Sequence, residues 1–223
     1  MGSFKSIYAV AAARKGGDAA LEALIAEHRP KTRAEIAATP DDRLLALMTR
    51  RVFQAGFSWS VIENKWPGFE AAFEGFDPRR CAAMSEETFD ALLKDARIVR
   101  NAQKILSVQA NARFLLDLAA RSGSAGSAIA DWPDDDYAGL LDLLKTKASR
   151  LGGESAMRFL RDVGKPSFIT SRDVAAALIR EGVLTRPPSG KRDLQAVQAA
   201  FNGWAKESGR DLTAISRVLA MSV

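Results

Sequence analysis

Apolar residues recur along this chain at the three- and four-residue intervals of amphipathic helices, without the strict apolar–polar alternation of a half-buried strand. Residues 39–42 (Thr-Pro-Asp-Asp) mark a helix start, since a cap residue, a proline and two acids stand in order. The same period predicts further helices over residues 18–28, 101–120, 134–147, 154–163, 173–181 and 192–208, and a short one after residue 211. The sequence therefore predicts an all-α protein of many short helices.

The formal net charge of +5 comes from the last third of the chain. Residues 1–144 hold 18 basic and 20 acidic side chains, whereas residues 145–223 hold 14 basic and 7 acidic ones. This asymmetry favours a polyanion such as DNA as a partner, with a solvated basic face as the alternative.

Cysteine and histidine usage narrows the classes of site further. The chain has one cysteine, Cys81, and one histidine, His28, which exclude an internal disulfide framework and a zinc site built on cysteine pairs. No run of about 18 apolar residues is present, and the first residues lack the apolar stretch of a signal peptide. We therefore expect a cytoplasmic protein of bacterial type with no membrane partner.

An ordered series of short motifs is the feature of the sequence that points most specifically to a function. The motifs are Gln-Ala-Gly-Phe-Ser-Trp at residues 54–59, Phe-Glu-Ala-Ala-Phe-Glu-Gly-Phe-Asp-Pro at 69–78, Asp-Ala-Arg-Ile-Val-Arg at 95–100, Lys-Ile at 104–105 and Asn-Ala-Arg at 111–113. Over about residues 48–118 this order and spacing resemble the DNA-3-methyladenine glycosylase I family of the helix-hairpin-helix DNA glycosylase superfamily. The resemblance implies one glycosylase-like unit over residues 1–223, with helices in two lobes flanking a DNA and base pocket. We expect residues 46–164 to form the central lobe, and residues 1–45 with 165–223 to form the other.

A glycosylase has to extrude a base from the duplex, fill the gap and hold the base in an aromatic pocket. The resemblance implies that Gly56 and Phe57 approach and fill the gap that the extruded base leaves, and that Trp59 forms a wall of the base pocket. The structural alternative is that Phe57 and Trp59 pack in the core beside a tight turn. We assign to the base pocket four more residues, which are Arg51, Gln54, Ser58 and Tyr8.

Residues 147–156 resemble the hairpin of this superfamily, whose glycine-containing turn offers backbone N–H groups to a DNA phosphate. Gly152 and Gly153 permit a close approach of the backbone, and Lys147 and Arg150 add positive charge. Ser155 completes the expected DNA contacts. A plain helix cap is the alternative interpretation.

The chain departs from the family pattern at its ends and in the pocket. The family holds a structural zinc through Cys and His residues at both ends, and this chain lacks that set, so we expect no metal. Arg51 stands where the family has the glutamate that binds the methylated base. Glu63, one helical turn after Trp59, is the nearest replacement carboxylate.

Many members of the superfamily use an aspartate after the hairpin to stabilise the transition state. Asp173 lies two residues beyond that position, which Ser171 occupies. Asp173 is therefore either a displaced catalytic carboxylate or part of a capping box with Thr170 as the cap.

We predict a monofunctional DNA glycosylase of base excision repair. It hydrolyses the N-glycosidic bond of an alkylated purine such as 3-methyladenine in double-stranded DNA. Water is the nucleophile, no cofactor takes part, and we expect a monomer that associates with the nucleoid. The alternative is a catalytically silent DNA-binding or damage-sensing protein on the same scaffold. A pocket with an inward carboxylate such as Glu63 favours the enzyme, and a pocket filled by Arg51 favours the silent binder.

Overall fold

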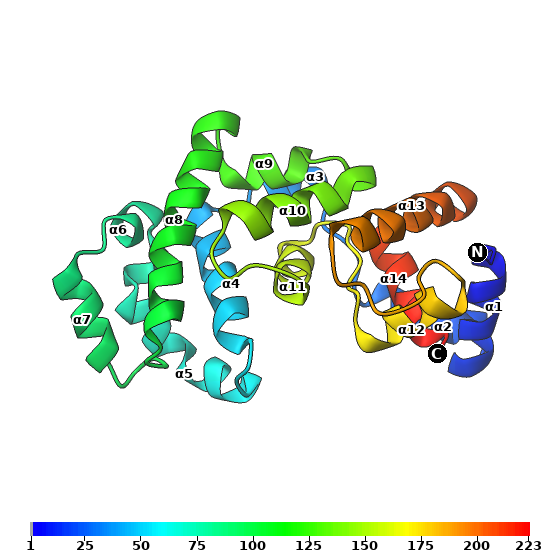
Figure 1. Ribbon diagram of the computed structural model, residues 1–223, viewed down its shortest axis with the longest axis horizontal. Coiled ribbons are helices and arrows are strands. Elements are labelled where there is room, and N and C mark those ends of the chain that lie inside the picture. The colour runs from blue at the N-terminus through cyan, green and yellow to red at the C-terminus, as the bar shows by residue number, and fades with distance from the viewer. Residues whose placement is uncertain (1) are drawn as a thin grey trace. The chain divides into compact units, whose positions relative to one another are not determined.

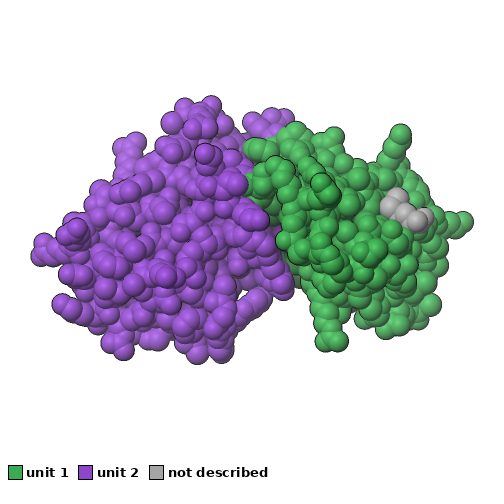
Figure 2. Space-filling view, in the orientation of Figure 1, with its two compact units in different colours: residues 1–31, 132–142, 164–223 green, residues 32–131, 143–163 purple. Residues whose placement is uncertain are grey.

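The computed structural model describes residues 2–223 and divides them into two compact units (Figures 1 and 2). Over these residues the chain is all-helical and has no strand, as the periodicity predicts. Unit 1 contains residues 2–31, 132–142 and 164–223, and unit 2 contains residues 32–131 and 143–163. Helix α10 (Tyr137–Lys147) begins in unit 1 and ends in unit 2.

Unit 2 holds the long helix α8 and the helices packed around it (Figure 1). Its elements are α3 (Arg33–Ala37), α4 (Asp41–Gln54), α5 (Trp59–Ala72), η1 (Glu74–Phe76), α6 (Pro78–Ala82), α7 (Glu86–Lys94), α8 (Ala102–Ser122), α9 (Ala125–Asp131) and α11 (Glu154–Val163). Helices α4, α6, α7 and α9 each pack against α8, and α11 packs against α4. Helices α4, α5 and α11 therefore belong to one packed unit.

Apolar burial explains this packing. The stripe on α4 is buried, with Leu44, Leu45 and Met48 wholly enclosed. The Phe53 ring of α4 meets the Phe69 ring of α5 edge-on at 4.7 Å between ring centroids, which holds α5 against α4.

Unit 1 joins the two ends of the described chain. Its helices, besides the start of α10, are α1 (Phe4–Lys15), α2 (Asp18–Ala26), α12 (Arg172–Arg180), α13 (Lys191–Ser208) and α14 (Leu212–Met221), and η2 (Asp134–Asp136) lies with them. Helix α1 packs against α2, α13 and α14. The indole nitrogen of Trp204 donates to the carbonyl of Gly2 at 3.1 Å, and the backbone N–H of Phe4 donates to Glu207 at 2.8 Å. These bonds and the buried Trp204 side chain fix the two ends together.

The bounds of the units differ from those of the expected lobes. Residues 32–45 belong to unit 2, because α3 packs against α9 and α4 packs against α8. Residues 132–142 belong to unit 1, where Gln198 accepts a hydrogen bond from the backbone of Ala138 at 2.8 Å. The segment expected around the hairpin, residues 147–156, joins α10 to α11.

Candidate base-binding site

The turn between α4 and α5 presents two aromatic rings to solvent. Gly56 has φ 75°, a left-handed conformation that glycine adopts without strain. The side chains that follow it, Phe57 and Trp59, are 42% and 47% exposed. Ser58 is the N-cap residue of α5, although its side chain makes no capping hydrogen bond. The alternative in which Phe57 and Trp59 belong to the core is therefore wrong.

A buried lysine holds this turn in place. The Lys104 side chain is 5% exposed, and its Nζ donates to the carbonyls of Phe53 at 3.1 Å and Ala55 at 2.7 Å. The ammonium also lies 4.5 Å from the centroid of the Phe57 ring. Burial, with a smaller contribution from Arg150, lowers the pKa of Lys104. The Lys104 ammonium thus binds the carbonyls that end α4 and supports the Phe57 ring.

A hollow of about 350 Å³ opens beside the turn. The residues that line it come from the end of α4, the turn, the start of α5 and the first turns of α11, and they are Arg51, Gln54, Ala55, Gly56, Trp59, Glu154, Ser155 and Arg158. Its volume lies at the lower end of the range of about 300–1,000 Å³ for small-ligand pockets. All of these residues belong to unit 2.

Arg51 is the centre of a polar network in the pocket wall. Its Nε and Nη2 donate to Asp162 at 2.5 and 2.6 Å, and its Nη1 donates to Oε1 of Gln54 at 2.9 Å. The amide nitrogen of Gln54 then donates to Glu63 at 2.8 Å. Glu63 also faces Arg50 at 3.7 Å and does not line the hollow, so it is not the inward carboxylate expected there; the carboxylate in the lining is that of Glu154.

Two guanidinium groups lie over the pocket's aromatic wall. The Cζ atoms of Arg51 and Arg158 are each 5.1 Å from the centroid of the Trp59 ring. Arg158 is held by Glu154, four residues earlier on α11, with an Nε to carboxylate distance of 2.9 Å. Trp59 thus offers an exposed aromatic surface beside two guanidinium groups, each paired with a carboxylate.

The hairpin turn between α10 and α11 is fixed by a side chain of α8. Asn111 is fully buried; its amide donates to the Ser149 carbonyl at 3.1 Å and accepts from the Ser149 N–H at 2.7 Å. Arg150 has φ 60° and Gly153 φ 56°, so the backbone turns sharply between the helices. The first N–H groups of α11 have no partner within their helix, as at every helix start.

The hairpin residues expected to bind DNA are exposed around this turn. Lys147, Arg150, Gly152 and Gly153 are all exposed, and Arg150 donates to Gln103 at 2.8 Å. An added Cβ on Gly152 would meet nothing closer than 3.8 Å, so this glycine is not required by protein packing. Ser155, the other expected contact, lines the base pocket and therefore connects the hairpin to it.

Two residues expected at the site, Tyr8 and Asp173, lie in unit 1. The Tyr8 hydroxyl donates to Glu22 at 2.7 Å, and burial raises the pKa of Tyr8 to about 12. Asp173 is exposed in the first turn of α12. The helix cap there is Ser171, whose hydroxyl accepts from Val174, so the expected capping box starting at Thr170 is wrong.

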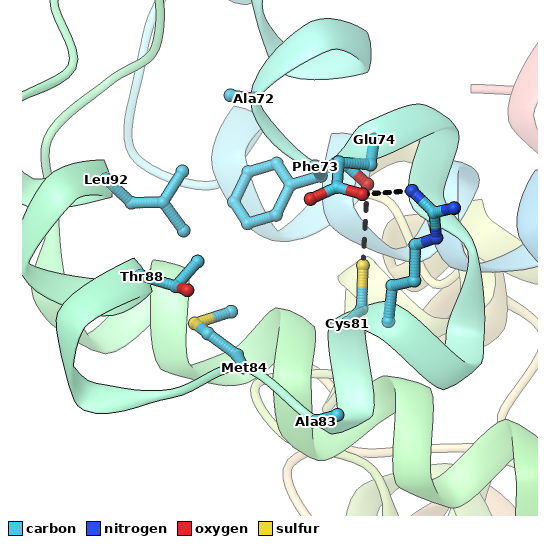
Figure 3. A pocket seen from close by; sticks show the side chains of 9 residues that line it. Ala72, Phe73, Glu74, Cys81, Ala83, Met84, Thr88 and Leu92 are labelled. Atoms are coloured by element: carbon cyan, nitrogen blue, oxygen red, sulfur yellow. Dashed lines mark hydrogen bonds and ion pairs between the residues drawn. The ribbon is translucent and has the colours of Figure 1, made fainter.

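Cys81 borders a separate, smaller hollow of about 90 Å³ in unit 2 (Figure 3). Its thiol donates to the carbonyl of Phe73 at 3.6 Å, and burial raises the pKa of Cys81 to about 12. Figure 3 shows the side chains of Phe73, Met84 and Leu92 around it. Cys81 thus behaves as a small, buried, apolar side chain, which is the usual role of a free cysteine.

The cysteine and histidine of the chain do not fit a structural zinc site. Zinc binds a cysteine as the thiolate, and burial, which raises the pKa of Cys81, disfavours that form. His28 belongs to unit 1 and Cys81 to unit 2. Over residues 2–223, no three metal-binding side chains gather into a possible ion site. In the same residues, no helix is both long and apolar enough to cross a bilayer.

Comparison with known proteins connects this site to a family. The DNA-3-methyladenine glycosylase 1 of Escherichia coli K12 is 36% identical over 80 residues, which cover 36% of this chain and 43% of that protein. The DNA-3-methyladenine glycosylase of Haemophilus influenzae is 32% identical over 63 residues, covering 28% of this chain and 34% of that protein. The matched part is thus less than half of the length of either relative.

A solved structure supports the fold. A mutant of 3-methyladenine DNA glycosylase I from Staphylococcus aureus superposes with a TM-score of 0.52 at 22% identity, covering 68% of this chain and 89% of that one. Residues 35–137, which include α4, the exposed turn, α5 and α8, match the family model described as methyladenine glycosylase. This central region is therefore similar to the methyladenine glycosylase family.

Proposed function

We propose that the protein is a DNA glycosylase that hydrolyses the bond between an alkylated purine and its deoxyribose in double-stranded DNA. The observation that carries this proposal is the exposed Trp59 ring, which walls a hollow of about 350 Å³ next to the exposed Phe57 ring. An extruded base needs an aromatic surface on which to stack, and the duplex it leaves needs a side chain to fill the gap. The names of the bacterial relatives give 3-methyladenine as the first base to test.

Each part of the site has a role in this proposal. Phe57, supported by Lys104, enters the gap in the base stack, while Trp59 stacks on the extruded base. The first turn of α11 and the glycines before it bind a phosphate with backbone N–H groups, and Lys147 and Arg150 add charge. Because the hairpin leads directly into the pocket residue Ser155, phosphate binding positions the nucleotide whose base is extruded.

The nucleophile in this proposal is water, and the product is a free base and an abasic site. Lys104 does not fit an amine nucleophile, because its ammonium is buried and donates to two backbone carbonyls. Glu63 acts through Gln54, to which it is hydrogen-bonded, and is a positioning residue. Asp173 is exposed in unit 1 and has no role in the proposed reaction. The protein acts as a monomer in the bacterial cytoplasm and joins the nucleoid when bound to DNA.

The second candidate is a silent DNA-binding or damage-sensing protein, which the position of Arg51 in the pocket wall favours. Duplex DNA treated with a methylating agent distinguishes the two, with released bases separated by chromatography and abasic sites cleaved by alkali. Release of a methylated purine, with strand breaks only after alkali, supports the glycosylase. Intact bases on DNA that the protein binds contradict the release of methylated purines and support the silent binder.

A further inference from the structure

We infer that the pocket prefers a neutral alkylated purine over a cationic one, and that Arg51 and Arg158 are the residues that set this preference. The inference rests on the proposed function, since it names the class of base that stacks on Trp59. Methylation of adenine at a ring nitrogen leaves the base positively charged in DNA. Other alkylations, such as the etheno bridge of 1,N6-ethenoadenine, leave the base neutral.

The residues that line the hollow include more positively than negatively charged side chains. Two guanidinium groups and one carboxylate, Glu154, belong to its lining. Asp162 neutralises Arg51 but is not among the lining residues. Arg51 is well enclosed, with 15% of its side chain exposed, so solvent screens its charge only in part. A cationic base on Trp59 would therefore lie beside two guanidinium groups, each with its Cζ 5.1 Å from the centroid of that ring.

The remaining hydrogen-bonding capacity also favours a neutral base. A guanidinium has five N–H donors and no acceptor. Three of the Arg51 donors are used by Asp162 and Gln54, which leaves one N–H on each terminal nitrogen. The Gln54 amide accepts from Arg51 and donates to Glu63, so both of its ends are engaged. The pocket thus offers donors, which match the ring-nitrogen or carbonyl acceptors of a neutral purine.

The bond-breaking step gives the two guanidinium groups a chemical role. When the glycosidic bond breaks, its electron pair goes to the base. A cationic base leaves as a neutral molecule, whereas a neutral base leaves with developing negative charge, which a nearby guanidinium stabilises. Water then gives its hydroxyl group to the sugar carbon and its remaining proton to the base. Arg51 and Arg158 therefore assist the departure of a neutral base and offer nothing to a cationic one.

The preference can be tested by binding alone. Calorimetry compares the binding of two free bases, each carrying a methyl group on the nitrogen that bears the sugar in DNA. The derivative of 1,N6-ethenoadenine is neutral. The derivative of 3-methyladenine is a fixed cation. We expect the wild-type protein to bind the neutral base at least about tenfold more tightly. Arg51→Gln leaves the Asp162 carboxylate without its partner, so this variant should bind the cationic base more tightly than the neutral one. The double variant Arg51→Gln with Asp162→Asn lacks this free carboxylate and should not prefer the cation. Arg172→Gln, at the exposed start of α12, removes the same charge elsewhere and leaves the preference unchanged.

Equal or tighter binding of the cation by the wild-type protein overturns the inference, and so does binding of neither base. If Arg51→Gln does not fold, as judged by circular dichroism, Arg158→Gln takes its place and must reduce the preference severalfold. Base release is not measured in this experiment. A charge preference found without any release from DNA therefore contradicts the proposed reaction and leaves the inference about the pocket in place.

Discussion

Arg51 and Asp162 form a two-pronged ion pair, in which both carboxylate oxygens of Asp162 accept from the guanidinium at 2.5 and 2.6 Å. The pair joins the end of α4 to α11, so that one contact fixes the pocket wall to the helix that follows the hairpin. Paired in this way, Arg51 leaves the hollow beside Trp59 open.

Removal of the carboxylate should be costly because it leaves a largely enclosed guanidinium without its partner. We expect Asp162→Asn to lower the free energy of unfolding in urea by about 1–3 kcal/mol. The double variant with Arg51→Gln should recover part of this loss, since no unpaired charge remains. Asp173→Asn, at an exposed position, should change stability by less than about 0.5 kcal/mol. Additive losses in the double variant would contradict direct coupling of the pair.

Replacement of Lys104 tests whether the exposed turn depends on a buried cation. Lys104→Met leaves the carbonyls of Phe53 and Ala55 without their donor, which should lower the free energy of unfolding by about 1–3 kcal/mol. Base release should fall further than DNA affinity, because Phe57 loses its support while the hairpin is unchanged. Lys94→Met, at the exposed end of α7, is the control. An equal fall in release and affinity would argue against a positioning role.

Asn111 provides a test of the hairpin. Asn111→Ala removes both hydrogen bonds to Ser149, so the turn should lose its fixed shape and DNA affinity should fall severalfold. Fluorescence anisotropy with an undamaged duplex measures this loss. Asn202→Ala removes a side-chain bond to the Asp135 carbonyl in unit 1 and should leave DNA affinity unchanged. Unaltered affinity in Asn111→Ala would show that DNA binds elsewhere.

Glu22 gives unit 1 a dependence on acid. A hydrogen bond from Arg210, opposed in part by burial, lowers the pKa of Glu22 in the folded protein below the ordinary value of a glutamate. The stabilisation is therefore complete above the unfolded pKa and is lost as pH falls through the lower folded pKa. Because Glu22 is 45% exposed, the effect should stay below about 1 kcal/mol. Urea unfolding between neutral pH and pH 3 should show a shallower acid dependence in Glu22→Gln, and an unchanged slope would contradict this account.

The local features of this molecule could be predicted from its sequence. The apolar periodicity indicates α11 over residues 154–163 and α13 over residues 192–208, because a helix buries one face along its own length. The motif after Gln54 indicates the turn that exposes Phe57 and Trp59. The capping pattern fits Thr170 as well as Ser171, because both carry a hydroxyl group, and the structure shows that Ser171 is the cap of α12.

The ion pairs and cation–aromatic contacts around the pocket could not be predicted from local sequence patterns. Asp162 is 111 residues from Arg51, and no local pattern pairs them. Arg158 follows Glu154 by four residues and reads as an ordinary surface pair on a helix, yet its guanidinium lies over Trp59. The burial of Lys104 likewise follows from the packing of α8 against α4, which its motif alone does not indicate.

The most direct test of the central claim is the initial rate of methylated-purine release from alkylated duplex DNA by the wild-type protein and two tryptophan variants. Trp59→Ala removes the pocket wall, whereas Trp132→Ala removes an indole of unit 1 that donates to the Asp136 carbonyl. The account predicts release by the wild-type protein and by Trp132→Ala, and a loss of at least about tenfold, or about 1.4 kcal/mol, in Trp59→Ala. Release that is equal in all three proteins would contradict the assignment of this hollow as the base pocket.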